Sequence, residues 1–128
     1  MTNIHSTAIV SKNALIGENV KIGPYCIIND NVVIGDDTKL ISNITIDGNT
    51  KIGKACTFFP YSTIGTSPQD LKFKGEKSFL EIGNNNVFRE YVTVNPGTLG
   101  GGLKTIIKNN CLFMVGSHIA HDCNIGNN

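Results

Sequence analysis

Tryptophan is absent from this 128-residue sequence and aromatic residues make up only 7% of it, so its core must be mainly aliphatic. No apolar run is long enough to span a bilayer, and the amino terminus lacks the basic and then apolar pattern of a signal peptide. With a net charge of +1, the totals give no sign of nucleic-acid binding. Without a secretion signal, the four cysteines are expected to be reduced thiols. We therefore expect a cytoplasmic chain that neither inserts into a membrane nor binds nucleic acid.

A period of six residues runs through most of the sequence. Every sixth position is Val, Ile, Leu or Phe, the next residue is often Gly, and the fourth residue after each anchor is usually small or β-branched. The register breaks twice and resumes each time. The anchors are Val10, Ile16, Ile22, Ile28, Ile34, Leu40, Ile46, Ile52, Phe58, Ile64, Ile82, Phe88, Val94, Ile107, Phe113, Ile119 and Ile125.

This period predicts an all-β solenoid. Six residues of an α-helix do not return to the same face, whereas short strands joined by tight turns can repeat every six residues. Three hexapeptides form one triangular coil of a parallel β-helix, and Gly, Asn and Asp tolerate the positive φ of its turns. We expect one domain, residues 1–128, of about six to seven coils; a sandwich with irregular spacing does not explain so long a register.

The small inward positions include all four cysteines, Cys26, Cys56, Cys111 and Cys123. We expect them to be interior thiols that pack like small hydrophobic side chains, and not nucleophiles or zinc ligands.

The two breaks predict loop insertions at about 66–77 and 99–104. In the first, Asp70 could hold a sugar hydroxyl and Lys72 or Lys74 a phosphate, although an ordinary solvated loop has the same composition. The second break overlaps a Gly-rich stretch, 95–102, which precedes no helix and lacks the end of a P-loop. Its three consecutive glycines indicate close backbone approach or flexibility.

Two of the three histidines lie near the end, in the segment 117–123. If Ile119 and Cys123 point inward, His118 and His121 point outward or along a bend. Asp122 could then orient the imidazole of His121, leaving its other nitrogen as a base for an alcohol, because histidine titrates at about pH 6.5. No third ligand lies nearby, so we expect no metal site. From the residues alone, His121 is a candidate general base or an incidental surface histidine.

Several stretches together resemble the amino-terminal half of the UDP-N-acetylglucosamine O-acyltransferases, which carry out the first step of lipid A synthesis. The hexapeptides are shared by many transferases, but the loop that begins Gln-Asp-Leu-Lys and the Gly-rich loop make the resemblance specific. The matching segments are 5–10, 22–26, 69–72 with 75–76, 97–102 and 118–123.

The resemblance implies a left-handed β-helix and transfer of a 3-hydroxyacyl group from acyl carrier protein to the glucosamine 3-hydroxyl of UDP-N-acetylglucosamine. It implies that His121 is the general base and Asp122 its partner. By the same resemblance, the nucleotide sugar contacts Gln69, Asp70, Lys72 and His118. It also implies a homotrimer without a cofactor or metal.

The chain departs from the family in two respects. Asn95 replaces a histidine that is common there, and family members are about twice as long. Their carboxy-terminal coils and helical domain are absent from this sequence, so the chain can be inactive alone. Two alternatives stay open: a non-catalytic solenoid that folds and oligomerises, and a nucleotide-sugar N-acetyltransferase that uses acetyl-CoA.

Overall fold

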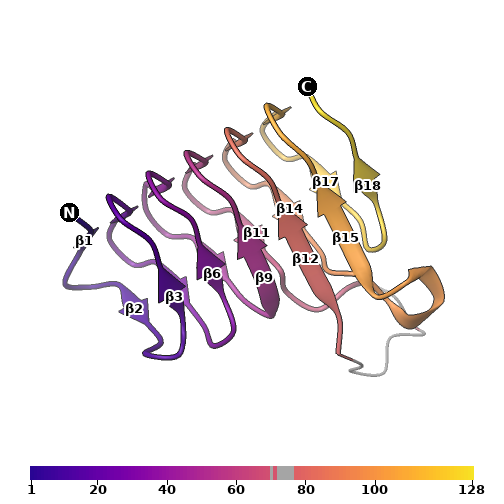
Figure 1. Ribbon diagram of the computed structural model, residues 1–128, viewed down its shortest axis with the longest axis horizontal. Coiled ribbons are helices and arrows are strands. Elements are labelled where there is room, and N and C mark those ends of the chain that lie inside the picture. The colour runs from indigo at the N-terminus through magenta and orange to yellow at the C-terminus, as the bar shows by residue number, and fades with distance from the viewer. Residues whose placement is uncertain (70, 72–76) are drawn as a thin grey trace.

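The chain winds into a parallel β-helix with three flat sides, as the period of six predicted, and the helix is left-handed, as the resemblance implied (Figure 1). The computed structural model describes residues 1–69, 71 and 77–128. Each side is a six-stranded parallel sheet that receives one strand from each successive coil. No helix in these described ranges is long and apolar enough to cross a membrane.

The strands of each sheet follow the axis of the solenoid in chain order. The first sheet contains β1 (Asn3–Ile4), β4 (Lys21–Ile22), β7 (Lys39–Leu40), β10 (Thr57–Phe58), β13 (Val87–Phe88) and β16 (Leu112–Phe113). The second contains β2 (Ile9–Val10), β5 (Ile27–Ile28), β8 (Thr45–Ile46), β11 (Thr63–Ile64), β14 (Thr93–Val94) and β17 (His118–Ile119). The third contains β3 (Leu15–Ile16), β6 (Val33–Ile34), β9 (Asn49–Ile52), β12 (Phe79–Ile82), β15 (Lys104–Ile107) and β18 (Asn124–Ile125).

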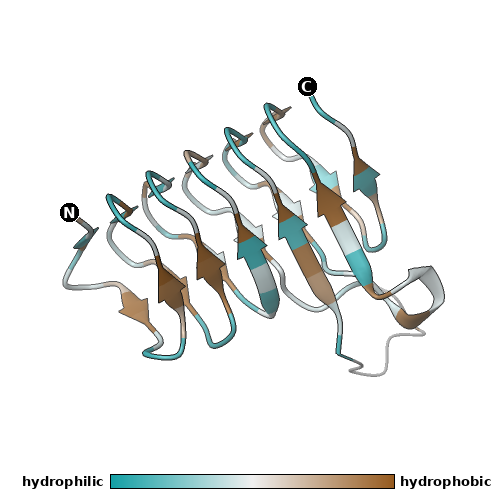
Figure 2. Ribbon diagram, viewed as in Figure 1, coloured by the Kyte–Doolittle hydropathy of each residue, from teal (hydrophilic) through white to brown (hydrophobic). Residues whose placement is uncertain are grey.

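Most strands are only two residues long, which gives each one outer and one inner side chain. The inner residue is the anchor that recurs at every sixth position. Ile22, Leu40 and Phe58, for example, are at most 2% exposed. Figure 2 shows hydrophobic residues recurring at the strands of each coil, with mostly hydrophilic turns between them. The core is therefore a set of parallel apolar columns along the solenoid axis.

The pairing register locates the two insertions. Lys39 pairs with Thr57, 18 residues later, but Thr57 pairs with Val87, 30 residues later, so twelve additional residues lie between β11 and β12. Val87 pairs with Leu112, 25 residues later, so seven additional residues lie between β14 and β15. This second segment contains a short 3₁₀ helix, Leu99–Gly101.

The turns use residues that tolerate a left-handed backbone, including Asn19, Asp37 and Asn85, as expected. Gly23, which follows the anchor Ile22, has a different reason. Gly23 has no positive φ, but a Cβ there would lie 1.8 Å from the carbonyl oxygen of Ile41 in the next coil. Close approach between coils, and not turn conformation, accounts for this glycine.

The cysteines lie where the pattern predicted them. Cys26, Cys56 and Cys111 are buried free thiols, and Cys123 packs against the core. Burial raises the pKa of the Cys26 and Cys56 thiols, which favours the unreactive protonated form.

Candidate functional site

A histidine and an aspartate that are neighbours in the sequence face each other in the turn after β17. The Nδ1 atom of His121 lies 2.8 Å from Oδ2 of Asp122. The side chains are 34% and 17% exposed, respectively, so the pair is reachable from solvent but only partly hydrated. Asp122 has a φ of 65°, and this left-handed backbone accompanies the turn of its carboxylate toward His121.

The carboxylate of Asp122 is held from its other side by Thr98, in the Gly-rich segment. The backbone N–H of Thr98 donates to Oδ1 and its hydroxyl donates to Oδ2, each at 2.5 Å. Partial burial raises the pKa of Asp122, but the hydrogen bonds from Thr98 and His121 outweigh it and hold that pKa below its usual range. Asp122 is therefore kept ionised beside the imidazole.

This pairing determines which histidine nitrogen is free. Since the carboxylate only accepts hydrogen bonds, the proton of neutral His121 belongs on Nδ1, which leaves Nε2 with a free lone pair. Such an arrangement can remove a proton from a hydroxyl group and then share the resulting positive charge with Asp122.

The side chain of His118 lies on a different surface from that of His121. It is the outer residue of β17, is exposed, and its Nδ1 lies 2.6 Å from the hydroxyl oxygen of Thr93, its partner on β14. The two histidines thus lie in one coil, His118 on the outer face of the second sheet and His121 at the corner that follows it.

The first insertion is attached to the coil next to this site. Asn95 is 4% exposed, and its Nδ2 donates to the carbonyl oxygens of Thr66 and Ser67, at 3.3 and 3.0 Å. Its backbone N–H donates to the carbonyl of Ile119, in the coil that carries His121. Asn95 therefore joins the base of the insertion to the histidine segment.

The sequence-predicted contacts in this insertion are described only in part. Gln69 is exposed, whereas Asp70 and Lys72 lie outside the described residues. Their roles stay predictions.

The sequence alone did not reveal Thr98 as a partner of Asp122. Thr98 is the fourth residue after the anchor Val94, so the repeat predicts a small inward residue there, and that prediction is wrong. Thr105 occupies the corner beside Leu80, because the seven-residue insertion displaces Thr98 into the loop. The sequence did contain a signal for this contact, because the glycines near Thr98 indicate that another part of the chain packs closely against the loop. A Cβ on Gly101 would lie 2.0 Å from Cγ of Asp122.

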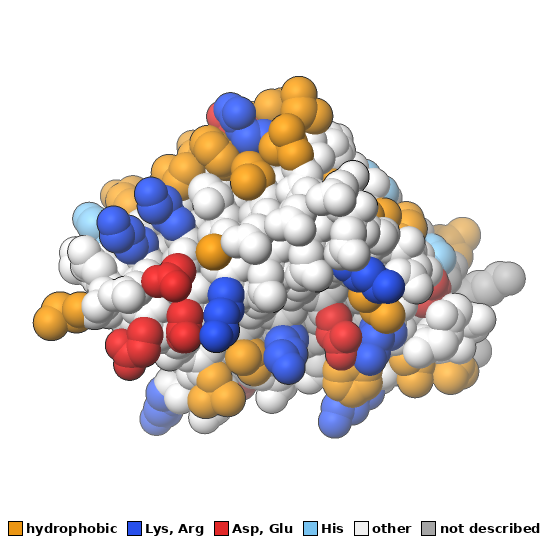
Figure 3. Space-filling view, turned by 45° about the horizontal axis from the view of Figure 1, so that its top comes forward, with side chains coloured by type: hydrophobic (Ala, Val, Ile, Leu, Met, Phe, Trp, Pro, Cys, Tyr) orange, Lys and Arg blue, Asp and Glu red, His pale blue; other side chains and the backbone are white. Residues whose placement is uncertain are grey.

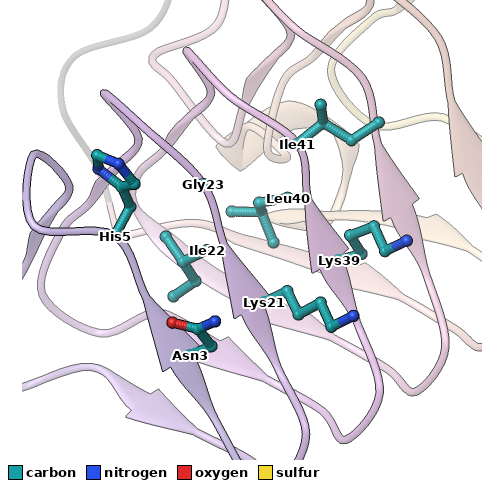
Figure 4. Close-up of a pocket in the computed structure, with 8 residues that line it drawn as sticks. All are labelled: Asn3, His5, Lys21, Ile22, Gly23, Lys39, Leu40 and Ile41. Atoms are coloured by element: carbon teal, nitrogen blue, oxygen red, sulfur yellow. The ribbon is translucent and has the colours of Figure 1, made fainter.

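The other surface features of the described residues do not form a second candidate for an acid–base site. A groove of about 430 Å³ lies over β1, β4 and β7, where Lys21 and Lys39 extend side by side and His5 stands at the rim (Figure 4). It contains no acid–base pair and lies several coils from His121. The face in Figure 3 intersperses both signs of charge. Within the part of the chain that the structure describes, no three His, Cys, Asp or Glu side chains come together to hold a metal ion.

Comparisons with known proteins are consistent with one another. The family model for bacterial transferase hexapeptides (six repeats) matches residues 13–41. The acyl-[acyl-carrier-protein]–UDP-N-acetylglucosamine O-acyltransferase of Aliarcobacter butzleri is 62% identical over 128 residues, 100% of this chain and 49% of that protein. The protein of that name from Rickettsia bellii is 52% identical over 124 residues, 97% of this chain and 44% of that protein.

A solved structure also matches closely. A crystal structure of UDP-N-acetylglucosamine acyltransferase has a TM-score of 0.96 and 47% identity, covering 98% of this chain and 48% of that one. This chain spans about half the length of the relatives that it matches.

Proposed function

Since the chain belongs to the UDP-N-acetylglucosamine O-acyltransferase family, of whose members it spans about half, we propose that it supplies the general base and part of the sugar site of such an enzyme. The reaction transfers a 3-hydroxyacyl group from acyl carrier protein to the glucosamine 3-hydroxyl of UDP-N-acetylglucosamine. The observation that carries this proposal is the His121–Asp122 pair, with its carboxylate held by Thr98.

The first chemical step is removal of a proton. Nε2 of His121 takes the proton of the sugar 3-hydroxyl as the oxygen attacks the carbonyl carbon of the thioester. The carbonyl electrons move to oxygen and form a tetrahedral oxyanion. Asp122 stabilises the imidazolium that has formed, because a carboxylate 2.8 Å away favours the charged ring.

The second step returns the proton. The oxyanion collapses to an ester, the carbon–sulfur bond breaks, and the leaving thiolate of the carrier protein takes the proton from His121. The atoms balance without a metal or a cofactor. We assign the nucleotide-sugar contacts to His118, beside the base, and to Gln69, Asp70 and Lys72 of the first insertion. The anchoring of that insertion to the β14–β17 region by Asn95 supports this assignment.

The test replaces the matching segment of the Aliarcobacter butzleri protein with this chain and measures acyl transfer to UDP-N-acetylglucosamine. We expect the hybrid to transfer acyl groups and His121→Ala to abolish the transfer. His5→Ala is the matched control, because the imidazole of His5 is exposed in the first coil and, among the described residues, hydrogen-bonds to Thr7 alone. Unchanged turnover in His121→Ala, or an inactive hybrid beside an active intact relative, contradicts the proposal.

The same assay addresses the alternatives. Use of acetyl-CoA in place of acyl carrier protein would identify an N-acetyltransferase, and transfer that survives His121→Ala in the hybrid would identify this chain as a non-catalytic scaffold. The homotrimer and the cytoplasmic location expected from the sequence stay predictions.

A further inference from the structure

Thr98 donates hydrogen bonds to both oxygens of the Asp122 carboxylate. Its N–H donates to Oδ1 of Asp122 and its hydroxyl donates to Oδ2, so the plane of the carboxylate is determined by two donors from a single residue. Thr98 is itself only 5% exposed. Its own carbonyl accepts the N–H groups of Gly101 and Leu103, so the donor is held by the loop that it belongs to.

The turn alone does not determine the direction of the Asp122 carboxylate. The third residue after the anchor has a left-handed backbone in many coils, as at Asp37, Asn85 and Asp122, so this φ by itself does not turn the carboxylate toward His121. The backbone N–H of Asp122 donates to the hydroxyl of Thr105, at 2.9 Å, which is buried on β15 in the preceding coil. Thr98 in the loop thus holds the carboxylate of Asp122, and Thr105 on β15 holds its backbone.

The shape of the loop depends on two glycines that flank Thr98. A Cβ on Gly97 would lie 1.9 Å from the backbone nitrogen of Lys104, and a Cβ on Gly101 would lie 2.0 Å from Cγ of Asp122. In contrast, a Cβ on Gly100 would have no heavy atom of the described residues within 4 Å, its two chain neighbours aside. The loop therefore lies directly against the carboxylate at Gly101 but not at Gly100.

We infer that Thr98 is a positioning residue for the acid–base pair: it orients Asp122 so that the proton of His121 stays on Nδ1 and Nε2 is free to act as the base. The inference rests on the proposed function, because it gives Thr98 a part in the same reaction. A purely structural role, in which Thr98 only fastens the loop to the last coil, predicts no effect on the tautomer of His121 in a folded chain.

The test reads the tautomer directly, from the ¹⁵N chemical shifts of the His121 ring in the 128-residue chain without substrate. We expect mainly the Nδ1–H form in the unaltered chain. Thr98→Val removes only the hydroxyl, and it should shift the ratio toward the Nε2–H form by about tenfold, the effect of losing one hydrogen bond to a charged group. Thr98→Ser keeps both donors and should restore the original ratio.

A second pair of variants covers the case in which Thr98→Val does not fold. Gly101→Ala should displace the carboxylate and shift the tautomer ratio in the same direction, whereas Gly100→Ala should leave it unchanged. An unchanged ratio in a folded Thr98→Val or Gly101→Ala chain overturns the inference, as does equal behaviour of Thr98→Val and Thr98→Ser.

The two proposals fail separately. If the ratio shifts as expected but acyl transfer in the hybrid survives His121→Ala, the proposed function is wrong and the placement of Asp122 by Thr98 stands. If His121→Ala abolishes transfer and the ratio never shifts, only the role of Thr98 is wrong.

Discussion

Replacing Phe88 with Ala should remove a large part of the stability of the solenoid. Phe88 is fully buried in β13, between two other phenylalanines of the same column. Its ring centroid lies 4.6 Å from that of Phe58 and 4.9 Å from that of Phe113, with the rings nearly parallel. The substitution therefore breaks two stacking contacts and opens a cavity in the middle of the core.

The magnitude follows from these contacts. A buried Phe→Ala change costs about 3–5 kcal/mol, and each aromatic pair adds roughly 0.5–1.5 kcal/mol beyond its buried area. The coils on either side are held at strand spacing by backbone hydrogen bonds, for example from Arg89 to Phe113, and cannot close the gap. We therefore expect a loss at the upper end, about 4–5 kcal/mol. That is a large share of the roughly 5–15 kcal/mol that stabilises a domain.

Urea unfolding followed by circular dichroism gives the free energy of unfolding of each variant. Tyr91→Ala is the matched control, because it also breaks one aromatic stack, with Tyr61 at 5.5 Å, but on a ring that is 61% exposed. We expect the control to lose no more than about 1 kcal/mol, since little apolar area leaves water there. Losses in the two variants within about 1 kcal/mol of each other would refute the reasoning from burial and stacking.

Three further predictions concern single residues. The pKa of Asp122 is lower in the folded chain than in the unfolded one, so its stabilising effect is present above the ordinary carboxyl pKa and is lost as the pH falls through the folded value. Urea unfolding at a series of acidic pH values should therefore show a smaller acid-induced loss for Asp122→Asn, and an equal loss would contradict this. Gly23→Ala places a Cβ 1.8 Å from a carbonyl oxygen of the next coil and should lower the free energy of unfolding by about 2 kcal/mol or more, whereas Gly100→Ala should be neutral in the same measurement. Asn95→Ala removes both hydrogen bonds to the base of the first insertion, each worth about 1 kcal/mol; protease should then cut the chain faster there, and an unchanged cleavage rate would show that Asn95 does not hold the loop.

The fold could be predicted because every coil repeats the same local requirement. A bulky residue every sixth position, as at Ile22, Leu40 and Phe58, is compatible with short strands around one axis and incompatible with a helix. The buried cysteines follow from the same register. The reason for Gly23 was less accessible, since its closest neighbour, Ile41, lies in the next coil and not in its own turn.

Local periodicity and adjacent residues were enough to predict the solenoid, its three sides and the candidate pair His121–Asp122. How that pair is held depends on a contact between segments that are distant in the sequence. Thr98 lies 24 residues before Asp122, and an insertion of seven residues moves it out of the repeat and onto the carboxylate. A periodic pattern predicts positions inside the repeat, whereas the path of an inserted loop depends on what it packs against, here the bare backbone of Gly101 beside Asp122.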